Sequence, residues 1–164
     1  MPGSEDSNKV AKMELKRAEV SDVLSRDAAF ANAPIVKLLG AASLGRGRLR
    51  RIADKAVLMQ QGDAGDSLFI VVAGEARLFA RKDRDSVELG HAHKGEVIGE
   101  GSVLEGGVRK TSAVAQGQLD VIEVPRDALL NAGVLLPALK SMLSEVFSRR
   151  TRALDEMNDF MNRW

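Results

Sequence analysis

The sequence of 164 residues contains no cysteine, so it can form no disulfide and has no thiolate chemistry. It has no apolar run of about 18 residues, the length that a membrane-spanning helix needs. It also has no excess of charge, because 24 lysines and arginines face 23 aspartates and glutamates. This balance argues against general affinity for nucleic acids, which depends on a concentrated basic surface.

The first eight residues are polar and acidic and lack the apolar stretch of a signal peptide. We therefore predict a disordered tail at residues 1–8. A hydrophobic content of 45% is sufficient for the core of one domain with additional helices. The absence of cysteine is compatible with a reducing cytoplasm.

The pattern along the chain changes twice. Residues 9–48 are predicted to form N-terminal helices, one running from Asn8 to about residue 24 and one over 28–42 that is interrupted near Pro34. From residue 49 to 124, short strands alternate with glycine-containing turns, which indicates an antiparallel sandwich or barrel. The predicted strands are residues 49–52, 57–60, 67–73, 76–80, 87–91, 97–98, 111–115 and 120–124.

Residues 125–164 are predicted to be helical again, with Pro125 starting a helix to about residue 131 and a long helix over 136–164. Nine positions of the long helix alternate three and four apart, and eight of them are apolar. They are Leu136, Leu139, Leu143, Val146, Arg150, Ala153, Met157, Phe160 and Trp164. This stripe either packs on its own domain or, as we slightly prefer, pairs with a second copy, with the head of Arg150 reaching water.

A glycine-rich turn is the most informative segment of the chain. Residues 95–102 read Gly-Glu-Val-Ile-Gly-Glu-Gly-Ser, and Arg109, Lys110 and Thr111 follow shortly after. Exposed N–H groups at a helix start and a nearby cation are suited to an anionic phosphate, and glycine lets the backbone approach it. A glutamate is a pure acceptor and is suited to a sugar hydroxyl.

Four motifs occur in order, namely Gly62-Asp63, Ala73-Gly74-Glu75, Gly99-Glu100 and Arg109-Lys110-Thr111. Their order and spacing resemble the cyclic nucleotide-binding domain family, which includes bacterial cyclic AMP receptors and protein kinase A regulatory subunits. The resemblance extends from about residue 49 to the C-terminus, and residues 99–114 resemble the family's phosphate-binding cassette. It implies an α+β fold, an eight-stranded antiparallel jelly-roll β-barrel with flanking N-terminal and C-terminal helices.

The resemblance also implies roles for individual residues. Glu100, preceded by Gly99, would bind the ribose 2′-hydroxyl, and the amides of Gly101 and Ser102 would face the phosphate. The phosphate cation is Arg109 by the spacing of kinase regulatory subunits. By the spacing of the bacterial receptor the phosphate cation is Lys110. In that receptor a hydroxyl residue follows the cation, as Thr111 follows Lys110 here, and we therefore favour Lys110.

The base would be held by Val87 and Leu89 on the preceding strand. Met157, Phe160 and Trp164 are candidate lids, although we prefer to interpret them as core of the heptad stripe. Gly101 departs from the family pattern, which usually has an apolar residue there. Glycine weakens a short helix by about 1 kcal/mol relative to alanine, so we expect a looser cassette.

His91 and His93 resemble half of a cupin metal site, but the chain has only two histidines and Glu96 follows too closely. We expect no metal and no cofactor, and no catalytic motif is present.

We interpret the chain as a cytoplasmic, non-enzymatic receptor for cyclic AMP or, as second choice, cyclic GMP. It is expected to be a stand-alone adaptor or a fragment, homodimeric through the C-terminal helix, with an unknown protein effector and no contact with nucleic acid or membrane. The alternative is an interaction module that lost its ligand or that binds cyclic di-GMP, and a cupin-type enzyme is a distant third.

Overall fold

The computed structural model describes residues 20–130 and 136–162. The tail predicted at residues 1–8 and most of the first predicted helix lie outside the described residues, but residues 20–26 are helical. Helix α2 spans Ala28–Ala31 and is capped by Asp27, whose side chain accepts a hydrogen bond from the Phe30 N–H. Helix α3 spans Pro34–Leu44, with its proline in the first turn.

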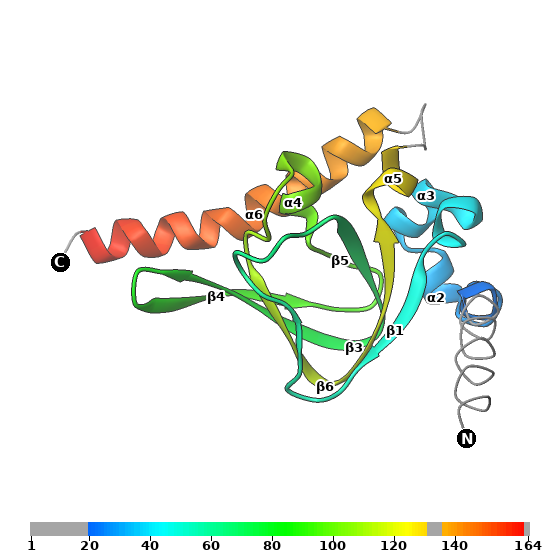
Figure 1. Cartoon of the computed structure of the whole chain (residues 1–164), viewed down its shortest axis with the longest axis horizontal. Coiled ribbons are helices and arrows are strands. Elements are labelled where there is room, and N and C mark those ends of the chain that lie inside the picture. Colours follow the sequence, from blue (N-terminus) through cyan, green and yellow to red (C-terminus); the bar gives the residue numbers. More distant parts are fainter. Residues whose placement is uncertain (1–19, 131–135, 163–164) are drawn as a thin grey trace, which may run out of the picture.

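The centre of the molecule is one antiparallel sheet rolled around its own interior (Figure 1). The strands are β1 (Arg48–Ile52), β2 (Val57–Met59), β3 (Ser67–Lys82), β4 (Asp85–Ala92), β5 (Val97–Ile98) and β6 (Ser112–Pro125). Their order is β1-β6-β3-β4, with β2 also paired to β6 and β5 to β3. The antiparallel sheet with flanking helices matches the prediction, whereas eight strands and a closed barrel do not describe this sheet.

The number of strands differs because β3 and β6 are long and bend. The predicted segments 67–73 and 76–80 are both parts of β3, and those predicted to begin at residues 111 and 120 both run into β6. Register shifts between Val71 and Glu75 let β3 turn a corner without losing its pairing with β6. Eight short segments of sequence therefore form six strands.

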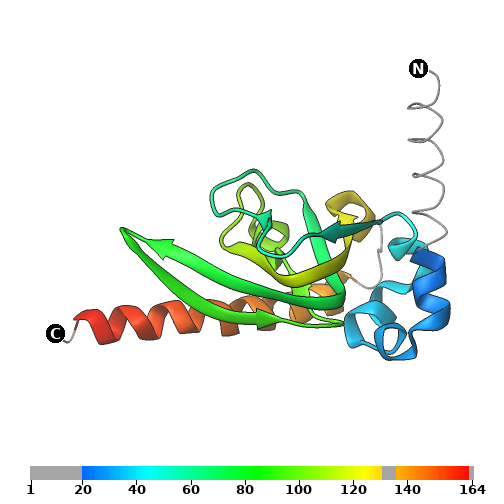
Figure 2. The same ribbon diagram turned by 90° about the horizontal axis from the view of Figure 1, so that it is seen from below.

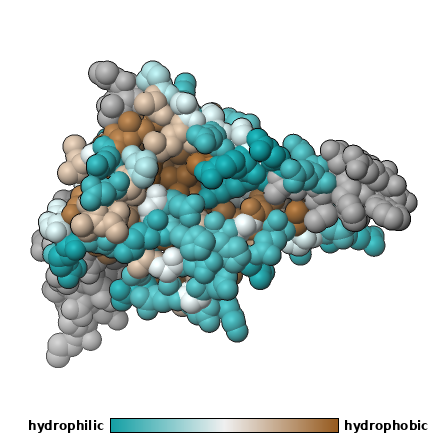
Figure 3. All heavy atoms as spheres, turned by 180° about the vertical axis from the view of Figure 1, so that it is seen from behind, coloured by the Kyte–Doolittle hydropathy of each residue, from teal (hydrophilic) through white to brown (hydrophobic). Residues whose placement is uncertain are grey.

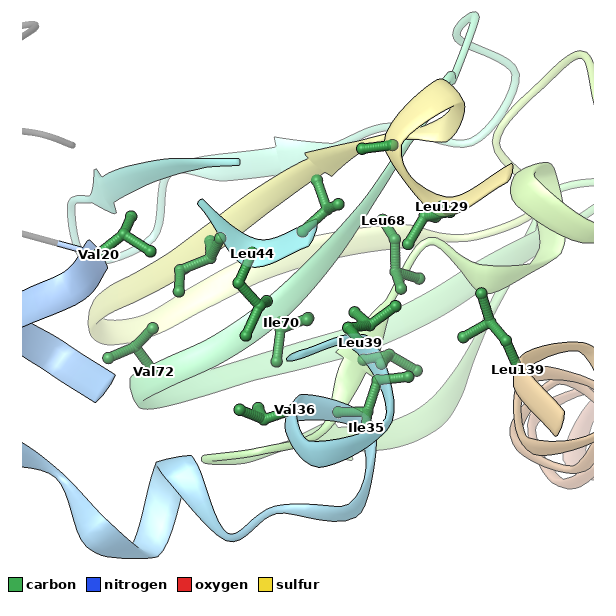
Figure 4. Packing of buried hydrophobic residues seen from close by; sticks show 14 of the residues in the cluster. Val20, Ile35, Val36, Leu39, Leu44, Leu68, Ile70, Val72, Leu129 and Leu139 are labelled. Carbon is green, nitrogen blue, oxygen red and sulfur yellow. The ribbon is translucent and has the colours of Figure 1, made fainter. Parts of the chain in front are cut away.

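Two hydrophobic clusters occupy the two faces of the sheet. Leu68, Ile70 and Val72 of β3 face the helices, and Figure 4 shows them packed against residues of α3. Phe69 and Val71 alternate with them and face the interior of the roll. In the space-filling view from behind, hydrophobic atoms gather toward the end of the molecule that carries the N-terminal helices (Figure 3).

Three helices follow or interrupt the later strands, namely α4 (Glu100–Glu105), α5 (Arg126–Leu130) and α6 (Leu136–Asn162). Helix α6 runs past α4 and continues beside the β3–β4 hairpin, as Figures 1 and 2 both show. None of the helices within the described residues is long and apolar enough to cross a membrane.

The apolar stripe of α6 is used inside the domain over its first turns, where Leu139 and Leu143 are buried. Pro137 and Ala138 are exposed at its start, and the exposed residues that the structure describes between 140 and 156 are polar: Lys140, Ser141, Ser144, Glu145, Ser148, Arg149, Arg152, Asp155 and Glu156. The side chains of Met157, Phe160 and Trp164 lie outside the described residues. Within the described part of α6, the interpretation that the stripe packs on its own domain is therefore the better one.

Candidate functional site

The glycine-rich turn lies where β5 ends and α4 begins. Gly99 is the residue before α4 and has a φ of 87°, a left-handed conformation that other residues rarely adopt. A Cβ at Gly99 would lie 2.4 Å from Nη1 of Arg109, and one at Gly65 would lie 2.3 Å from Nε of the same side chain. Both glycines are therefore needed to make room for the Arg109 guanidinium.

The loop that carries the Gly62-Asp63 motif holds the backbone of Arg109. The Gly62 N–H donates to the Arg109 carbonyl at 2.9 Å, and the Arg109 N–H donates to the Asp63 carbonyl at 2.7 Å. The Gly65 N–H donates to the Gly107 carbonyl at 3.1 Å. Two motifs that are distant in the sequence thus form one short backbone ladder beside the glycine-rich turn.

The Arg109 side chain is buried, at 5% exposure, and is held by oxygens of two serines. Nη1 donates to the Ser67 carbonyl at 2.7 Å and to the Ser102 hydroxyl at 2.9 Å, with the Gly99 carbonyl farther away at 3.4 Å. Nη2 donates to the Ser67 hydroxyl at 2.9 Å. A guanidinium has five N–H donors, so these bonds leave Nε and one proton of Nη2 for an anionic oxygen.

Burial lowers the pKa of the Arg109 guanidinium, and the carboxylates of Glu123, Asp66 and Glu100 act in the opposite direction. An arginine so placed still carries its charge at neutral pH. Its Cζ also lies 5.0 Å from the centroid of the Phe69 ring, within the range of a cation–π contact. The roll therefore keeps a desolvated positive charge at this turn.

Glu100 is also buried, at 4% exposure, and it is paired with Arg150 of α6. Nη1 of Arg150 donates to Oε2 of Glu100 at 2.6 Å, and the Arg150 side chain is only 10% exposed. The expectation that the head of Arg150 reaches water is wrong, because the helix places this residue over the cassette and its charge is balanced there.

Gly101 is covered by α6 as well. A Cβ at Gly101 would lie 2.9 Å from Cγ of Lys110 and 3.0 Å from Cε2 of Phe147. The departure from the family's usual apolar residue therefore has a physical reason, since the space is filled by the Phe147 ring. Helix α6 contacts the cassette through two neighbouring pairs, Phe147 on Gly101 and Arg150 on Glu100.

Lys110 and Thr111 follow Arg109 on the same loop but lie less deep. The Lys110 side chain is 36% exposed, and its Nζ is 3.5 Å from Oε2 of Glu105 at the end of α4. Thr111 is half-buried. The structure thus places Arg109, rather than Lys110, in the buried position next to Glu100 and Ser102.

A cavity of about 140 Å³ adjoins the Glu100–Arg150 pair, between β4 and α6. It is lined by two apolar residues, Leu89 and Val146, and by four polar ones, His91, Glu96, Arg149 and Arg150. Leu89, predicted to face the base, therefore lines a cavity together with Arg150, the partner of Glu100. Val87, predicted for the same role, is buried on β4 but is not among the described residues that line this cavity.

His91 and His93 are engaged by carboxylates on the β3–β4 surface. Nδ1 of His91 lies 2.7 Å and Nε2 of His93 lies 3.1 Å from the same oxygen of Glu75. Within the described ranges, no group of three or more potential ligands is arranged to hold a metal ion.

The sequence of the chain matches the model of the cyclic nucleotide-binding domain over residues 49–132. This match spans half of the chain, and it includes the roll, the cassette and α5. The chain therefore belongs to the cyclic nucleotide-binding domain family.

The cyclic AMP receptor protein of Thermus thermophilus is 32% identical over 109 residues, covering 64% of this chain and 49% of that protein. The chain thus spans about half the length of this curated relative. The crystal structure of the Thermus thermophilus catabolite activator protein has a TM-score of 0.63 at 26% identity, covering 81% of this chain and 62% of that one. The regulatory domain of Toxoplasma gondii protein kinase A, solved with cAMP, has a TM-score of 0.66 at 20% identity, covering 80% of this chain and 51% of that one. At this identity the similarity shows only that the two chains share a fold.

Sequence analysis did not identify four residues of the site: Ser67, Glu123, Phe147 and Arg150. Arg150 gave a signal, because it is the one charged residue in an apolar stripe and a buried charge needs a partner. Ser67 and Glu123 gave none, since their contact depends on the register of β3 against β6.

Proposed function

We propose that the chain is a receptor for a cyclic mononucleotide, with cyclic AMP as the first ligand and cyclic GMP as the second. The observation that carries this proposal is the burial of Glu100 and Arg109 around one turn, with Ser102 of that turn bound to Arg109. A desolvated cation beside a desolvated carboxylate suits a ligand that is both a phosphate and a sugar.

The roles of the residues follow from their positions. Arg109 takes the phosphate with Nε and the remaining proton of Nη2, and its buried position supports it over Lys110. Glu100 accepts a hydrogen bond from the ribose 2′-hydroxyl. The base enters the cavity between β4 and α6, where Leu89 and Val146 supply apolar surface.

Ligand binding is coupled to α6 in this proposal. The carboxylate that would accept the sugar hydroxyl is already bound to Arg150, so the ligand and the helix share one partner. A ligand shifts a conformational equilibrium only by its different affinities for the two states. A rearranged Glu100–Arg150 pair supplies that difference, and the protein passes it on as a change in helix position to a protein effector, without catalysis.

Titration calorimetry of the purified chain with cyclic AMP, cyclic GMP and cyclic di-GMP tests the ligand. We expect a cyclic mononucleotide to bind with micromolar affinity or better, about −8 kcal/mol, and to raise the melting temperature. Absence of heat and of a thermal shift at millimolar concentrations would favour the interaction module that lost its ligand. Binding of cyclic di-GMP alone would favour the other alternative.

The proposal includes self-association through α6. The exposed described residues of α6 between 140 and 156 are polar, so pairing of two copies is assigned to the turns beyond residue 156. Sedimentation at tens of micromolar, compared with a chain truncated after Arg152, tests it. A monomer with and without nucleotide would remove dimerisation from the proposal.

A further inference from the structure

The inner face of the sheet ends in polar residues where it meets the cassette. In the register of the sheet, Glu123 of β6 lies opposite Phe69 of β3 and opposite Arg48 of β1. Ser67 is two residues before Phe69 and Arg50 is two residues after Arg48, so both point to this same face. The four polar side chains, of Ser67, Glu123, Arg48 and Arg50, form a polar rim above the apolar interior of the roll, to which Phe69 belongs.

Two hydrogen bonds link Arg109 to this rim, and both donate in the direction from Arg109 through Ser67 to Glu123. The Ser67 hydroxyl donates to Oε2 of Glu123 at 2.7 Å and accepts from Nη2 of Arg109 at 2.9 Å. A serine hydroxyl has one proton, so giving it to Glu123 turns the oxygen lone pairs toward the guanidinium. The Ser67 side chain is buried between its two partners, which restricts its other rotamers.

In this structure Glu123 also supplies the main negative charge that balances the Arg109 guanidinium. Glu100 is bound to Arg150, and among the carboxylates that oppose the effect of burial on the Arg109 pKa, Glu123 contributes most. Glu123 itself is shared with Arg50 at 3.1 Å and with Arg48 at 3.6 Å. These two arginines hold the carboxylate on the rim.

We propose that Glu123 is a positioning residue that, through the Ser67 hydroxyl, fixes the Arg109 guanidinium in the orientation required for phosphate. This inference rests on the proposed function in its last step only, because the position of Arg109 can be measured without ligand. The Glu123 carboxylate itself touches neither phosphate nor sugar.

The first experiment follows the Arg109 guanidinium by nitrogen-15 NMR in the full ligand-free chain. We expect its N–H signals to show hindered rotation in the parent protein and to lose it in Glu123→Gln and in Ser67→Ala. The matched control is Asp120→Asn, which removes a carboxylate from the same strand that pairs with Arg51 at 3.0 Å. Unchanged Arg109 signals in both rim variants would overturn the proposal.

The second experiment measures the dissociation constant of cyclic AMP in a double-mutant cycle with Arg109→Lys. Glu123→Gln should weaken binding about tenfold in the parent, as expected for a hydrogen bond to a charged group, and much less in the Arg109→Lys background, which lacks the planar fork. Asp120→Asn should leave the constant unchanged. Equal losses in both backgrounds would show that Glu123 acts through general stability and would overturn the proposal.

The two experiments separate the two hypotheses. If the parent chain binds no cyclic nucleotide, the proposed function fails, while the NMR comparison still decides whether Glu123 positions Arg109. If the parent chain binds cyclic AMP and the Arg109 NMR signals do not change in Glu123→Gln, only this inference fails.

Discussion

The site has two sides, the roll with its cassette and helix α6, and each side contributes one buried arginine. The two arginines, Arg109 of the roll side and Arg150 of the α6 side, are held in different ways. Arg109 is surrounded by oxygens of Ser67 and Ser102, and its backbone is fixed by the neighbouring loop. Arg150 is held by one short ion pair to Glu100. Arg109 is thus part of the framework, whereas Arg150 depends on a partner that a ligand could take.

This difference suggests a division of labour. Several neutral acceptors set by backbone positions pre-arrange a cation at small further cost when an anion arrives. A single buried ion pair has little net stability to lose when it is exchanged for another partner, because its desolvation cost is large. We therefore expect the roll to recognise the ligand and α6 to change position when the ligand binds.

The largest expected effect on ligand affinity comes from a substitution of the arginine on the roll side. Arg109→Ala should reduce affinity for cyclic AMP by about 2–5 kcal/mol, the usual cost of losing one partner of a desolvated charge contact. Lys110→Ala, its neighbour in sequence, should change affinity by less than about 1 kcal/mol because an exposed ion pair is weak. Calorimetry measures both, and circular dichroism shows whether each variant is folded.

The reverse result would assign the phosphate to Lys110. That outcome would restore the register of bacterial receptors, in which Thr111 supplies the following hydroxyl. Arg109→Lys distinguishes charge from geometry, since lysine keeps the charge but lacks the planar fork. It should bind more weakly than the parent and more strongly than Arg109→Ala.

The second effect comes from breaking the α6 side. Arg150→Met should lower the free energy of unfolding of the ligand-free chain by about 3–5 kcal/mol, because it leaves Glu100 buried without its partner. Arg152→Met changes an exposed arginine two residues farther along α6, outside the cavity lining, and serves as the control. Urea unfolding with and without cyclic AMP measures the difference, which should shrink when the ligand supplies a new partner for Glu100. Equal effects of the two substitutions would show that the Glu100–Arg150 pair is not a holding contact.

The sequence predicts the roll side of this comparison better than the α6 side. Gly99, Glu100, Ser102 and Arg109 lie within eleven residues, so a local motif is enough to bring them together. Arg150 comes 50 residues after Glu100, and their contact depends on how α6 crosses α4. Periodicity identifies the apolar stripe of α6 but cannot say which surface the stripe covers.

The same limit explains the number of strands. Alternation and glycines locate nearly every segment of the sheet, but they cannot tell a bend within a strand from a turn between two strands. Register shifts in β3 are set by its pairing with β6, a contact between segments about 50 residues apart. The Ser67–Glu123 contact arises from that pairing and is likewise invisible in the sequence.

A smaller effect should follow from filling the space between the two sides. Gly101→Ala should favour α4 by up to about 1 kcal/mol of helix propensity, but its Cβ would press on the Phe147 ring. We expect the clash to prevail and α6 to exchange hydrogen for deuterium faster near Phe147. Adding Phe147→Leu should relieve the pressure and restore slow exchange. Unchanged exchange in Gly101→Ala would mean that α6 adjusts at no cost and that Phe147 does not hold it.

The smallest effect concerns an exposed contact between the helices and the roll, Lys94 with Asp27. The Lys94 ammonium and, next, the Phe30 N–H hold the pKa of Asp27 below its ordinary value of 3.8. A lowered pKa in the folded state gives stability that is present above pH 3.8 and is lost as the pH falls through the folded-state pKa. Lys94→Met should therefore reduce stability near neutral pH by less than about 1 kcal/mol, as exposed pairs do, and the gap to the parent should close in acid. Urea unfolding at pH 7 and pH 3 measures the gap, with Lys37→Met, an exposed lysine of α3, as the control. A gap that persists unchanged at low pH would show that Lys94 stabilises the protein by packing rather than through Asp27.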